Sequence, residues 1–513
     1  TNFEATDVLQ VVDGTDISGV TGLDVGVLDF QDGNATITLD AAQNGSMSIL
    51  NAGTGTQTIT LSSAGTPTGA VEVEAYILAD GDQTFTLGAA SQDVTSGTGA
   101  VVIDTGSIAD ITDAVFDGSK ATTSFAVNLA ADTDISGATI TGTNGNQDAD
   151  YEITLASNVD ATMTVAQNAR ITNADGANTV TLFNSGAATG FGGVEAYVLA
   201  DGDQTFTIGG GSQDVTTGSG NVVIDTGSTL TAYVATYNYF DNGLGWQYGA
   251  TSPEFASEAE ARQFVADEKQ APHHPNPVVL AVNQVQPTMD VVFNGAAATS
   301  LLINLASDLD LSGSAITGVN GTLDLDYTIT IDTNVIATMT IAQNARVTTA
   351  DGANIVTLFD AGTATGNSHV EGYYLADGAN TFTMVAGNRT VTGGTGDDIV
   401  TGTTGGDTII GGDGNDRITG ADGADNMDGG DGDDVFIIAD AAHHDAGETI
   451  TGGDNTDTIR FTSTAGATLT LDTNVNVEEA RITDAAGVAT GATAESIDAT
   501  NAQGTIALYG NDG

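Results

Sequence analysis

Short runs in which Thr, Val and Ile alternate with other residues recur along the chain. Examples are "TITLD" at 36–40, "TFTIG" at 205–209 and "DYTITI" at 326–331, and Gly, Asn and Asp separate such runs. Alternation with a period of two is typical of strands with one buried face, and β-branched residues favour strands. Helical periodicity is nearly absent. The pattern therefore predicts an all-β fold built from many short strands.

The same order of strands and turns recurs three times. The stretch "VEAYILADGDQTFTLG" at 73–88 returns as "VEAYVLADGDQTFTIG" at 194–209 and as "VEGYYLADGANTFTMV" at 370–385. Tandem repeats predict stacked units that share a continuous core. We predict β-repeat modules over residues 1–110, 111–228 and 291–392, and a partial module over 461–513.

A segment of different composition, residues 229–290, interrupts the repeats. It holds the only Trp, Trp246, and most of the prolines. A helix is predicted through "EFASEAEARQFVADEK", because Ser252 can cap it, Pro253 fits its first turn and Pro272 stops it. The segment is either a small subdomain packed on the repeats or a contact arm for a neighbouring subunit.

The charge of the chain narrows its partners. Its 513 residues include 68 acidic and 9 basic side chains, for a formal charge of −59. This charge repels nucleic-acid phosphates and anionic lipids, so neither is an expected partner. The chain has no cysteine and cannot form disulfides. No apolar run reaches the roughly 18 residues of a membrane span.

From Gly393 the chain divides into nonapeptides without a gap. They read "GGTGDDIVT", "GTTGGDTII", "GGDGNDRIT", "GADGADNMD" and "GGDGDDVFI", and "GGDNTDTIR" follows at 452–460. The sixth position is always Asp: Asp398, Asp407, Asp416, Asp425, Asp434 and Asp457. The eighth is always apolar: Val400, Ile409, Ile418, Met427, Phe436 and Ile459. Glycines permit positive φ, so six residues can form a tight loop before a three-residue strand. A flexible linker would not keep an apolar residue at every ninth position.

These nonapeptides closely resemble the RTX (repeats in toxin) family. The resemblance implies that residues 393–460 form a parallel calcium β-roll, with ions held between loops 18 residues apart. It places Asp398, Asp416 and Asp434 on one edge and Asp407 and Asp425 on the other. Calcium prefers six to eight hard oxygen ligands, more than one loop offers. Further oxygen donors are expected at Thr395, Asp397, Asp413, Asn415, Asp422, Asp431, Asp433, Asp454 and Asp457. The second repeat has Thr404 and Gly406 in place of acids, so its site is expected to be weaker.

The first two modules resemble altered versions of this roll. We match 211–227 to 387–403 and assign Val223 to the position of Asp398, and Val102 to the same position in the first module. An apolar residue there cannot bind calcium but can pack, which predicts metal-free coils leading into calcium-bound coils. Irregular strand spacing leaves β-sandwiches as an alternative for the upstream parts of the modules.

One motif resembles an enzyme. "VVIDTGS" occurs twice, with Asp104 and Asp225, and resembles the paired catalytic loops of pepsin-like aspartic peptidases, where two carboxylates activate water. The alternative is a strand and turn copied with the module. Three facts favour the alternative. The residues around each motif repeat too, and Thr401 replaces the Asp in the third module. In the peptidases a Tyr-Gly of the flap follows the first motif, whereas Tyr248-Gly249 here follows the second. We expect no enzyme.

RTX chains made almost wholly of β-repeats resemble bacterial surface-layer proteins and large secreted adhesins. The resemblance implies type I secretion, folding in external calcium and a place outside the cell, at the bacterial surface. We first expect a structural protein that assembles with copies of itself into a surface layer or filament. The alternative is an adhesin that binds a surface or a cell-surface polysaccharide.

Overall fold

The computed structural model describes residues 8–21, 26–31, 33–51, 55–111, 113–210, 213–227, 232–241, 245–251, 278–285, 291–444, 447–471, 474–484, 486–488 and 495–510. The chain forms two compact units. The first comprises Thr1–Ile224, Val291–Leu301 and Ile316–Gly321, and the second comprises Asp225–Asp290, Leu302–Ala315 and Thr322–Gly513.

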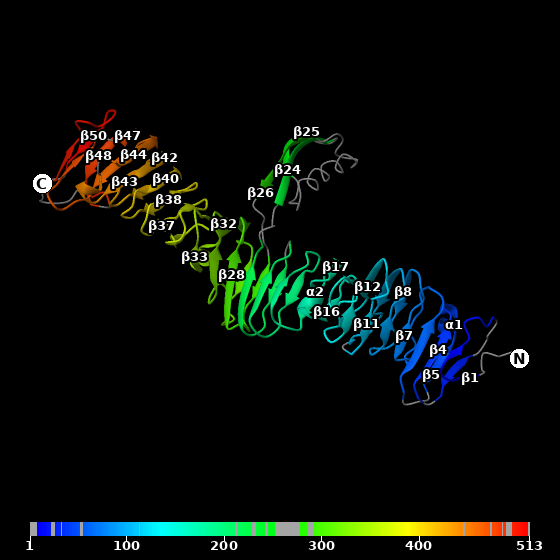
Figure 1. Ribbon diagram of the computed structural model, residues 1–513. Coiled ribbons are helices and arrows are strands. Elements are labelled where there is room, and N and C mark those ends of the chain that lie inside the picture. The colour runs from blue at the N-terminus through cyan, green and yellow to red at the C-terminus, as the bar shows by residue number, and fades with distance from the viewer. Residues whose placement is uncertain are drawn as a thin grey trace. The chain divides into compact units, whose positions relative to one another are not determined.

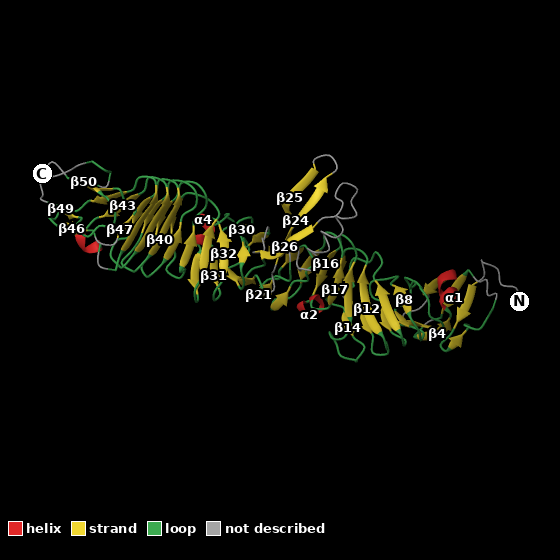
Figure 2. Ribbon diagram, turned by 90° about the horizontal axis from the view of Figure 1, so that it is seen from above, coloured by secondary structure: helices red, strands yellow, loops and turns green. Residues whose placement is uncertain are grey.

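Both units are parallel β-solenoids, in which each strand pairs with strands one coil away. In the first unit β10 (Ala100–Asp104) pairs residue for residue with β12 (Ser124–Leu129). In the second, β39 (Ile399–Thr401) pairs with β41 (Arg417–Thr419) 18 residues later. The stacked strands are visible around β12 and β40 in Figures 1 and 2. The all-β repeat fold is therefore confirmed. The β-sandwich alternative is wrong for the described residues, because neighbouring repeat strands run parallel and are joined by whole coils.

The strands of the first unit form successive parallel sheets. They are β1 (Val8–Val11), β3 (Val27–Phe30) and β5 (Ser48–Asn51); β17 (Ile171–Ala174), β15 (Glu152–Leu155), β12, β10 and β8 (Gln83–Thr86); β14 (Thr139–Thr141), β11 (Val115–Asp117), β9 (Asp93–Thr95), β7 (Ala75–Ile77), β6 (Gln57–Leu61), β4 (Ala35–Leu39) and β2 (Thr15–Asp16); β13 (Thr133–Asp134), β16 (Asp160–Met163), β18 (Thr179–Leu182), β20 (Ala196–Val198), β22 (Asp214–Thr216), β27 (Val292–Asn294) and β30 (Ala315–Thr317); and β19 (Ala187–Thr189), β21 (Gln204–Thr207) and β23 (Asn221–Asp225).

The second unit is built on two long parallel sheets with shorter ones beside them. The long sheets are β29 (Leu309–Asp310), β32 (Ile336–Met339), β34 (Ile355–Leu358), β36 (Gly372–Tyr374), β38 (Thr390–Thr392), β40 (Thr408–Asp413), β42 (Asn426–Asp431), β44 (Thr449–Asp454) and β47 (Asn474–Val475); and β35 (Thr363–Thr365), β37 (Thr381–Thr383), β39, β41, β43 (Val435–Ile438), β45 (Thr458–Phe461), β48 (Glu479–Ile482) and β50 (Ala507–Tyr509). The shorter ones are β28 (Ser300–Leu305), β31 (Thr328–Ile331) and β33 (Val347–Ala350); and β46 (Thr468–Thr470) and β49 (Ser496–Asp498).

The core of each coil is a row of inward side chains from alternate strand positions. In β12 the side chains of Phe125, Val127 and Leu129 are buried and those between them are partly exposed. Full burial of such a side chain stabilises the fold by roughly 1.5–3 kcal/mol. Each of the three modules has the same pair of aromatic side chains in its core. The pairs are Tyr76 with Phe85, Tyr197 with Phe206 and Tyr373 with Phe382, at ring-centroid distances of 4.6, 4.7 and 4.8 Å. The period-two pattern of the sequence is thus the pattern of burial.

One-turn helices form corners that the strand pattern did not predict. They are α1 (Ala41–Ser46), α2 (Val165–Asn168), α4 (Ile341–Asn344) and the 3₁₀ turn η1 (Ala441–His443). In α2, Thr164 and Gln167 form a capping box, and the buried Gln167 amide also donates to the Ile135 carbonyl at 2.8 Å. A Thr three residues before a Gln was the available signal. No helix in the described part of the chain is long and apolar enough to cross a membrane.

The segment at 229–290 contains the one antiparallel sheet among the described residues. Its strands β24 (Ala232–Asp241), β25 (Gly245–Thr251) and β26 (Val278–Val285) lie in the order β25-β24-β26. The predicted helix after Ser252 lies outside the described residues. The role of this segment stays a prediction.

Candidate metal centre

The aspartates at the sixth nonapeptide position lie in two columns, one on each side of the coils. One column precedes strands β39, β41, β43 and β45: Asp398, Asp416, Asp434 and Asp457. The other precedes β40 and β42: Asp407 and Asp425. Parallel pairing aligns successive loops on each side. We call the coils that carry these aspartates the aspartate coils.

Each column is linked by hydrogen bonds between aspartates of successive coils. Asp416 Oδ1 accepts from the backbone N–H of Asp398 at 2.8 Å, and Asp434 Oδ1 accepts from that of Asp416 at 2.8 Å. In the other column, Asp425 Oδ1 accepts from the Asp407 N–H at 2.7 Å. All of these aspartates are at most 1% exposed. One carboxylate oxygen of each accepting residue is therefore occupied by the main chain.

The other carboxylate oxygen of Asp416, Asp434 and Asp457 is buried and accepts no hydrogen bond. Burial raises the pKa of Asp416 and Asp434 to about 6 and that of Asp457 to about 7, and nearby carboxylates add to each rise. A buried carboxylate is costly to ionise unless a partner compensates its charge. These oxygens point to a cation as that partner.

Glycines at the second and fourth positions shape the loops around these oxygens. Gly430 and Gly432 have φ angles of +109° and +142°, which favour glycine. A Cβ on either would overlap the carbonyl oxygen of Gly412 or Gly414, its counterpart one coil earlier. The loops thus stack with main-chain carbonyl oxygens facing the next coil. Closely spaced hard oxygens are the ligands that calcium prefers.

The remaining predicted donors lie on the outer rim of the loops. Exposed side chains occupy the third and fifth positions: Thr395, Asp397, Asp413, Asn415, Asp422, Asp431, Asp433 and Asp454. The fifth position forms a ladder of its own, since Asp397 Oδ1 accepts from the Asn415 N–H at 2.8 Å and Asn415 Oδ1 from the Asp433 N–H at 2.9 Å. Among the described residues, three or more His, Asp or Glu side chains do not converge as a metal-binding group. The main-chain carbonyl oxygens of the stacked loops are further hard donors beside these carboxylates.

Two glutamates continue the columns and were missed by the sequence analysis. Glu478 Oε2 accepts from the Asp457 N–H at 2.9 Å, as the aspartates do. Glu448 is 1% exposed and precedes β44 as Asp425 precedes β42, and its Oε1 lies 3.3 Å from Nδ1 of the buried His444. Each stands one residue before the strand of its coil. This position in the repeat was the available signal in the sequence. The segments around Glu448 and Glu478, however, lack the glycines at the positions that mark a nonapeptide.

The residues present fit calcium in the aspartate coils. Buried carboxylates of the sixth position and main-chain carbonyls of the loops would hold the ion, and calcium when bound supplies the positive charge that the buried carboxylates lack. The chain's own contribution is to stack the loops in register, with glycines at the positions where a Cβ would overlap the neighbouring loop. Which rim residues add oxygens stays a prediction.

The structure corrects the position of the valines that replace aspartate upstream. Val101 is opposite Gln83 in the pairing of β10 with β8, and it is fully buried. Val222 is likewise buried, whereas Val102 and Val223 are only half-buried. The predicted positions, Val102 and Val223, were therefore wrong by one residue. A shift of one residue along a strand moves a side chain to the opposite face.

Asp104 and Asp225 are held by turns and neighbouring asparagines. Asp104 accepts from the Gly106 N–H at 2.8 Å and the Asn128 amide at 2.9 Å. Asp225 accepts from the Gly227 N–H at 2.8 Å and the Asn304 amide at 3.2 Å. The two strands that carry them belong to different sheets. These contacts describe a repeated strand and turn.

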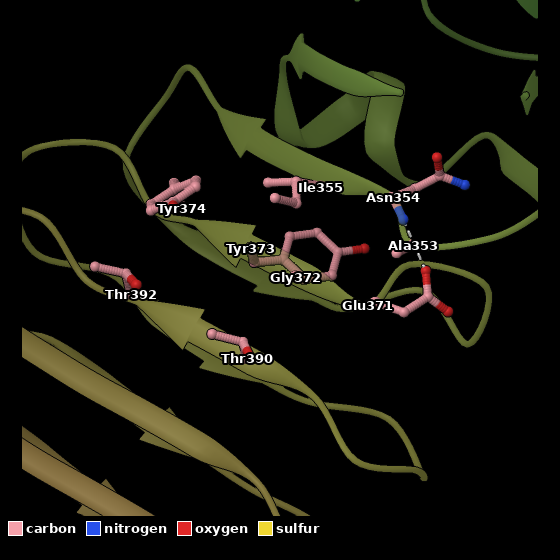
Figure 3. Close-up of a pocket in the computed structure, with 9 residues that line it drawn as sticks. All are labelled: Ala353, Asn354, Ile355, Glu371, Gly372, Tyr373, Tyr374, Thr390 and Thr392. Atoms are coloured by element: carbon pink, nitrogen blue, oxygen red, sulfur yellow. Dashed lines mark hydrogen bonds between the residues drawn. The ribbon is translucent and has the colours of Figure 1, made fainter. Parts of the chain in front are cut away.

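A shallow hollow of about 250 Å³ lies on the outer face of the third module. Figure 3 shows Tyr374 and Ile355 beside each other, with Thr390 and Thr392 on the next strand and Glu371 near the end of the hollow. Tyr374 is 48% exposed. The hollow forms at a glycine, Gly372, where the other modules have alanine.

Comparison with known proteins finds one match. Residues 385–412 and 401–436 match the family model of the RTX calcium-binding nonapeptide repeat (4 copies). No curated protein and no solved structure matches the chain. The chain therefore carries an RTX β-roll with calcium-binding repeats within a parallel solenoid.

Proposed function

We propose that this chain is an extracellular structural protein, stabilised by calcium, that assembles with copies of itself into a surface layer or filament on a bacterial cell. The observation that carries the proposal is the pair of buried aspartate columns inside a chain built almost wholly of coils. Binding energy at such columns becomes folding energy. A chain of this kind is exported unfolded by type I secretion and folds where calcium is plentiful.

Charge and exposed strand edges support assembly. A formal charge of −59 makes copies repel each other until divalent cations neutralise it. Strand β50 is the last described strand of its sheet, and its Leu508 and Tyr509 are 49% and 43% exposed. A parallel strand from a second copy would pair with this edge as coils pair within the chain. Such a head-to-tail contact does not close, so it propagates.

Electron microscopy and light scattering of the purified chain test assembly. We expect ordered polymers in millimolar calcium and monomers in chelator or in sodium chloride of equal ionic strength. Leu508→Lys should weaken assembly and leave the circular dichroism spectrum unchanged. Monodisperse monomer in millimolar calcium, with the fold intact, would reject the structural function.

A second candidate is an adhesin, and the hollow around Tyr374 favours it. An exposed aromatic face beside hydroxyl groups of Thr390 and Thr392 suits a sugar ring, which has an apolar face and polar edges. The ligand would be a cell-surface polysaccharide. Glycan-array binding that is abolished by Tyr374→Ala and kept by Tyr374→Phe would support it, whereas no binding to any glycan would reject it.

A further inference from the structure

The aspartate coils begin directly after a coil with an amide at the sixth position. Asn380 lies 18 residues before Asp398 and is 5% exposed. Its side-chain nitrogen donates to the carbonyls of Ala376 and Gly378, both at 2.8 Å, and to Asp398 Oδ1 at 2.9 Å. One amide nitrogen thus faces three oxygens, two from its own loop and one from the next coil.

The first module contains the same arrangement. Gln83 occupies the sixth position of "LADGDQTFT", and its amide nitrogen donates to the carbonyls of Ala79 and Gly81, the second and fourth residues of the loop. Gln204 in the second module instead donates to the Asn184 carbonyl at 3.4 Å. We call the coils of Gln83, Gln204 and Asn380 the amide coils. In each of them a neutral amide nitrogen donates to a main-chain carbonyl oxygen, and for Gln83 and Asn380 these carbonyls belong to the same loop.

An aspartate at the same position reverses this chemistry. The Asp416 side chain has an oxygen where Asn380 has its nitrogen, and that oxygen is buried without a hydrogen bond. A carboxylate oxygen cannot donate to the loop carbonyls. Oxygens gathered at one point need a cation between them, whereas an amide nitrogen removes that need.

We propose that Asn380 is an internal substitute for a calcium ion and sets the end of one calcium column. The proposal rests on calcium binding by the aspartate coils. In the other column, Arg389 holds the corresponding place one coil before Asp407. Its guanidinium contacts Glu371 at 3.2 Å and the Ser368 carbonyl at 2.6 Å. These guanidinium contacts lie in the preceding coil, so the role of substituting for an ion is assigned to Asn380 alone. In the column of Asp398, the sixth residue thus decides which coils take a metal ion.

The test is Asn380→Asp in the full chain, with bound calcium measured by equilibrium dialysis and atomic absorption. This change replaces one nitrogen by an oxygen and keeps the shape of the side chain. We expect one additional calcium ion per chain relative to the unchanged protein. In chelator the variant should melt at a lower temperature than the unchanged protein, and calcium should restore the loss.

Two further variants separate the substitute from a merely structural asparagine. Asn380→Ala should also lower the melting temperature, but without added calcium binding and without recovery specific to calcium. Asp416→Asn should bind fewer calcium ions than the unchanged protein and should lose less stability in chelator than Asp416→Ala. This reciprocal change keeps the idea testable even if Asn380→Asp does not fold.

The outcomes distinguish this inference from the proposed function. If the unchanged chain binds no calcium, the calcium function itself is rejected. If the unchanged chain binds calcium and folded Asn380→Asp binds the same number of ions, Asn380 is not a substitute for an ion. Unchanged calcium binding by Asp416→Asn would lead to the same conclusion.

Discussion

The nonapeptides at 78–86 and 411–419 share one plan, but the carbonyl oxygens of their loops meet different partners. Each has six loop residues followed by three strand residues, with a fully buried eighth residue, Phe85 or Ile418. The first ends its loop with Gln83, whose amide donates to the loop carbonyls. The second ends it with Asp416, whose buried Oδ2 accepts no hydrogen bond. The comparison shows that one repeat geometry yields either a self-sufficient coil or a coil that needs a cation.

Removal of calcium should have the largest effect and should separate the two kinds of coil. A ligand at 100 times its Kd stabilises the folded state by about 2.7 kcal/mol per site. In chelator, amide hydrogen exchange over 393–460 should therefore accelerate by about a hundredfold or more, while residues 73–104 keep their protection. Mass spectrometry of proteolytic peptides measures both segments in one sample. Equal protection of both segments with and without chelator would refute the distinction.

Truncation of a core phenylalanine should rank second. Phe436→Ala in an aspartate coil and Phe206→Ala in an amide coil each remove a fully buried ring, at a cost of about 3–5 kcal/mol. The loss from Phe206→Ala should be the same with and without calcium. Phe436→Ala should in addition weaken calcium binding, because it loosens the stack of loops. Thermal melting across a calcium series provides the measurement, and a calcium-dependent loss in Phe206→Ala would contradict the comparison.

Alanine at the fourth loop position should have a smaller effect that again differs between the coils. Gly81 and Gly432 both have positive φ, which costs a residue with a Cβ about 1–2 kcal/mol. A Cβ on Gly81 has its nearest neighbour at 3.4 Å, whereas one on Gly432 would overlap the Gly414 carbonyl oxygen. Gly432→Ala should thus lose more stability than Gly81→Ala, and only Gly432→Ala should lower calcium affinity. Denaturant unfolding and calcium titration of both variants would show whether the order is reversed.

Acidification in chelator should give the smallest effect, with a sign opposite to ordinary acid unfolding. The pKa of Asp416 and Asp434 is raised to about 6 and that of Asp457 to about 7. A carboxyl group whose pKa is raised by folding contributes stability at low pH, and this contribution is lost as pH rises through the folded-state pKa. Without calcium, the aspartate coils should become more ordered as pH falls from 8 toward 5.

Calcium should reverse that dependence, because protons then compete with the ion for the same oxygens. Hydrogen exchange at several pH values, corrected for the intrinsic exchange rate, measures the effect for 393–460. Asp434→Asn should reduce the pH dependence in chelator. Stability that falls steadily with acid in chelator would contradict the raised pKa values.

The sequence alone predicted the fold class and the calcium segment. Strict period-two alternation predicted half-buried strands. An apolar residue at the eighth position of each nonapeptide predicted a narrow core, and Val400, Ile418 and Phe436 are indeed buried there. These features are visible because they repeat at a fixed period. The alignment that placed Val223 at the position of Asp398 failed, because an error of one residue exchanges the two faces of a strand.

Only the tertiary structure decided what each loop does with its oxygens. In the sequence, Asn380 and Gln83 look like ordinary turn residues. Their role depends on the carbonyl groups that the fold places beside their side-chain amides. Glu448 and Glu478 joined the columns only when parallel pairing aligned their coils with Asp425 and Asp457. Periodicity is a property of the chain and can be read along it. The partner of a buried polar atom depends on which coils the fold places next to each other, and no local pattern records that.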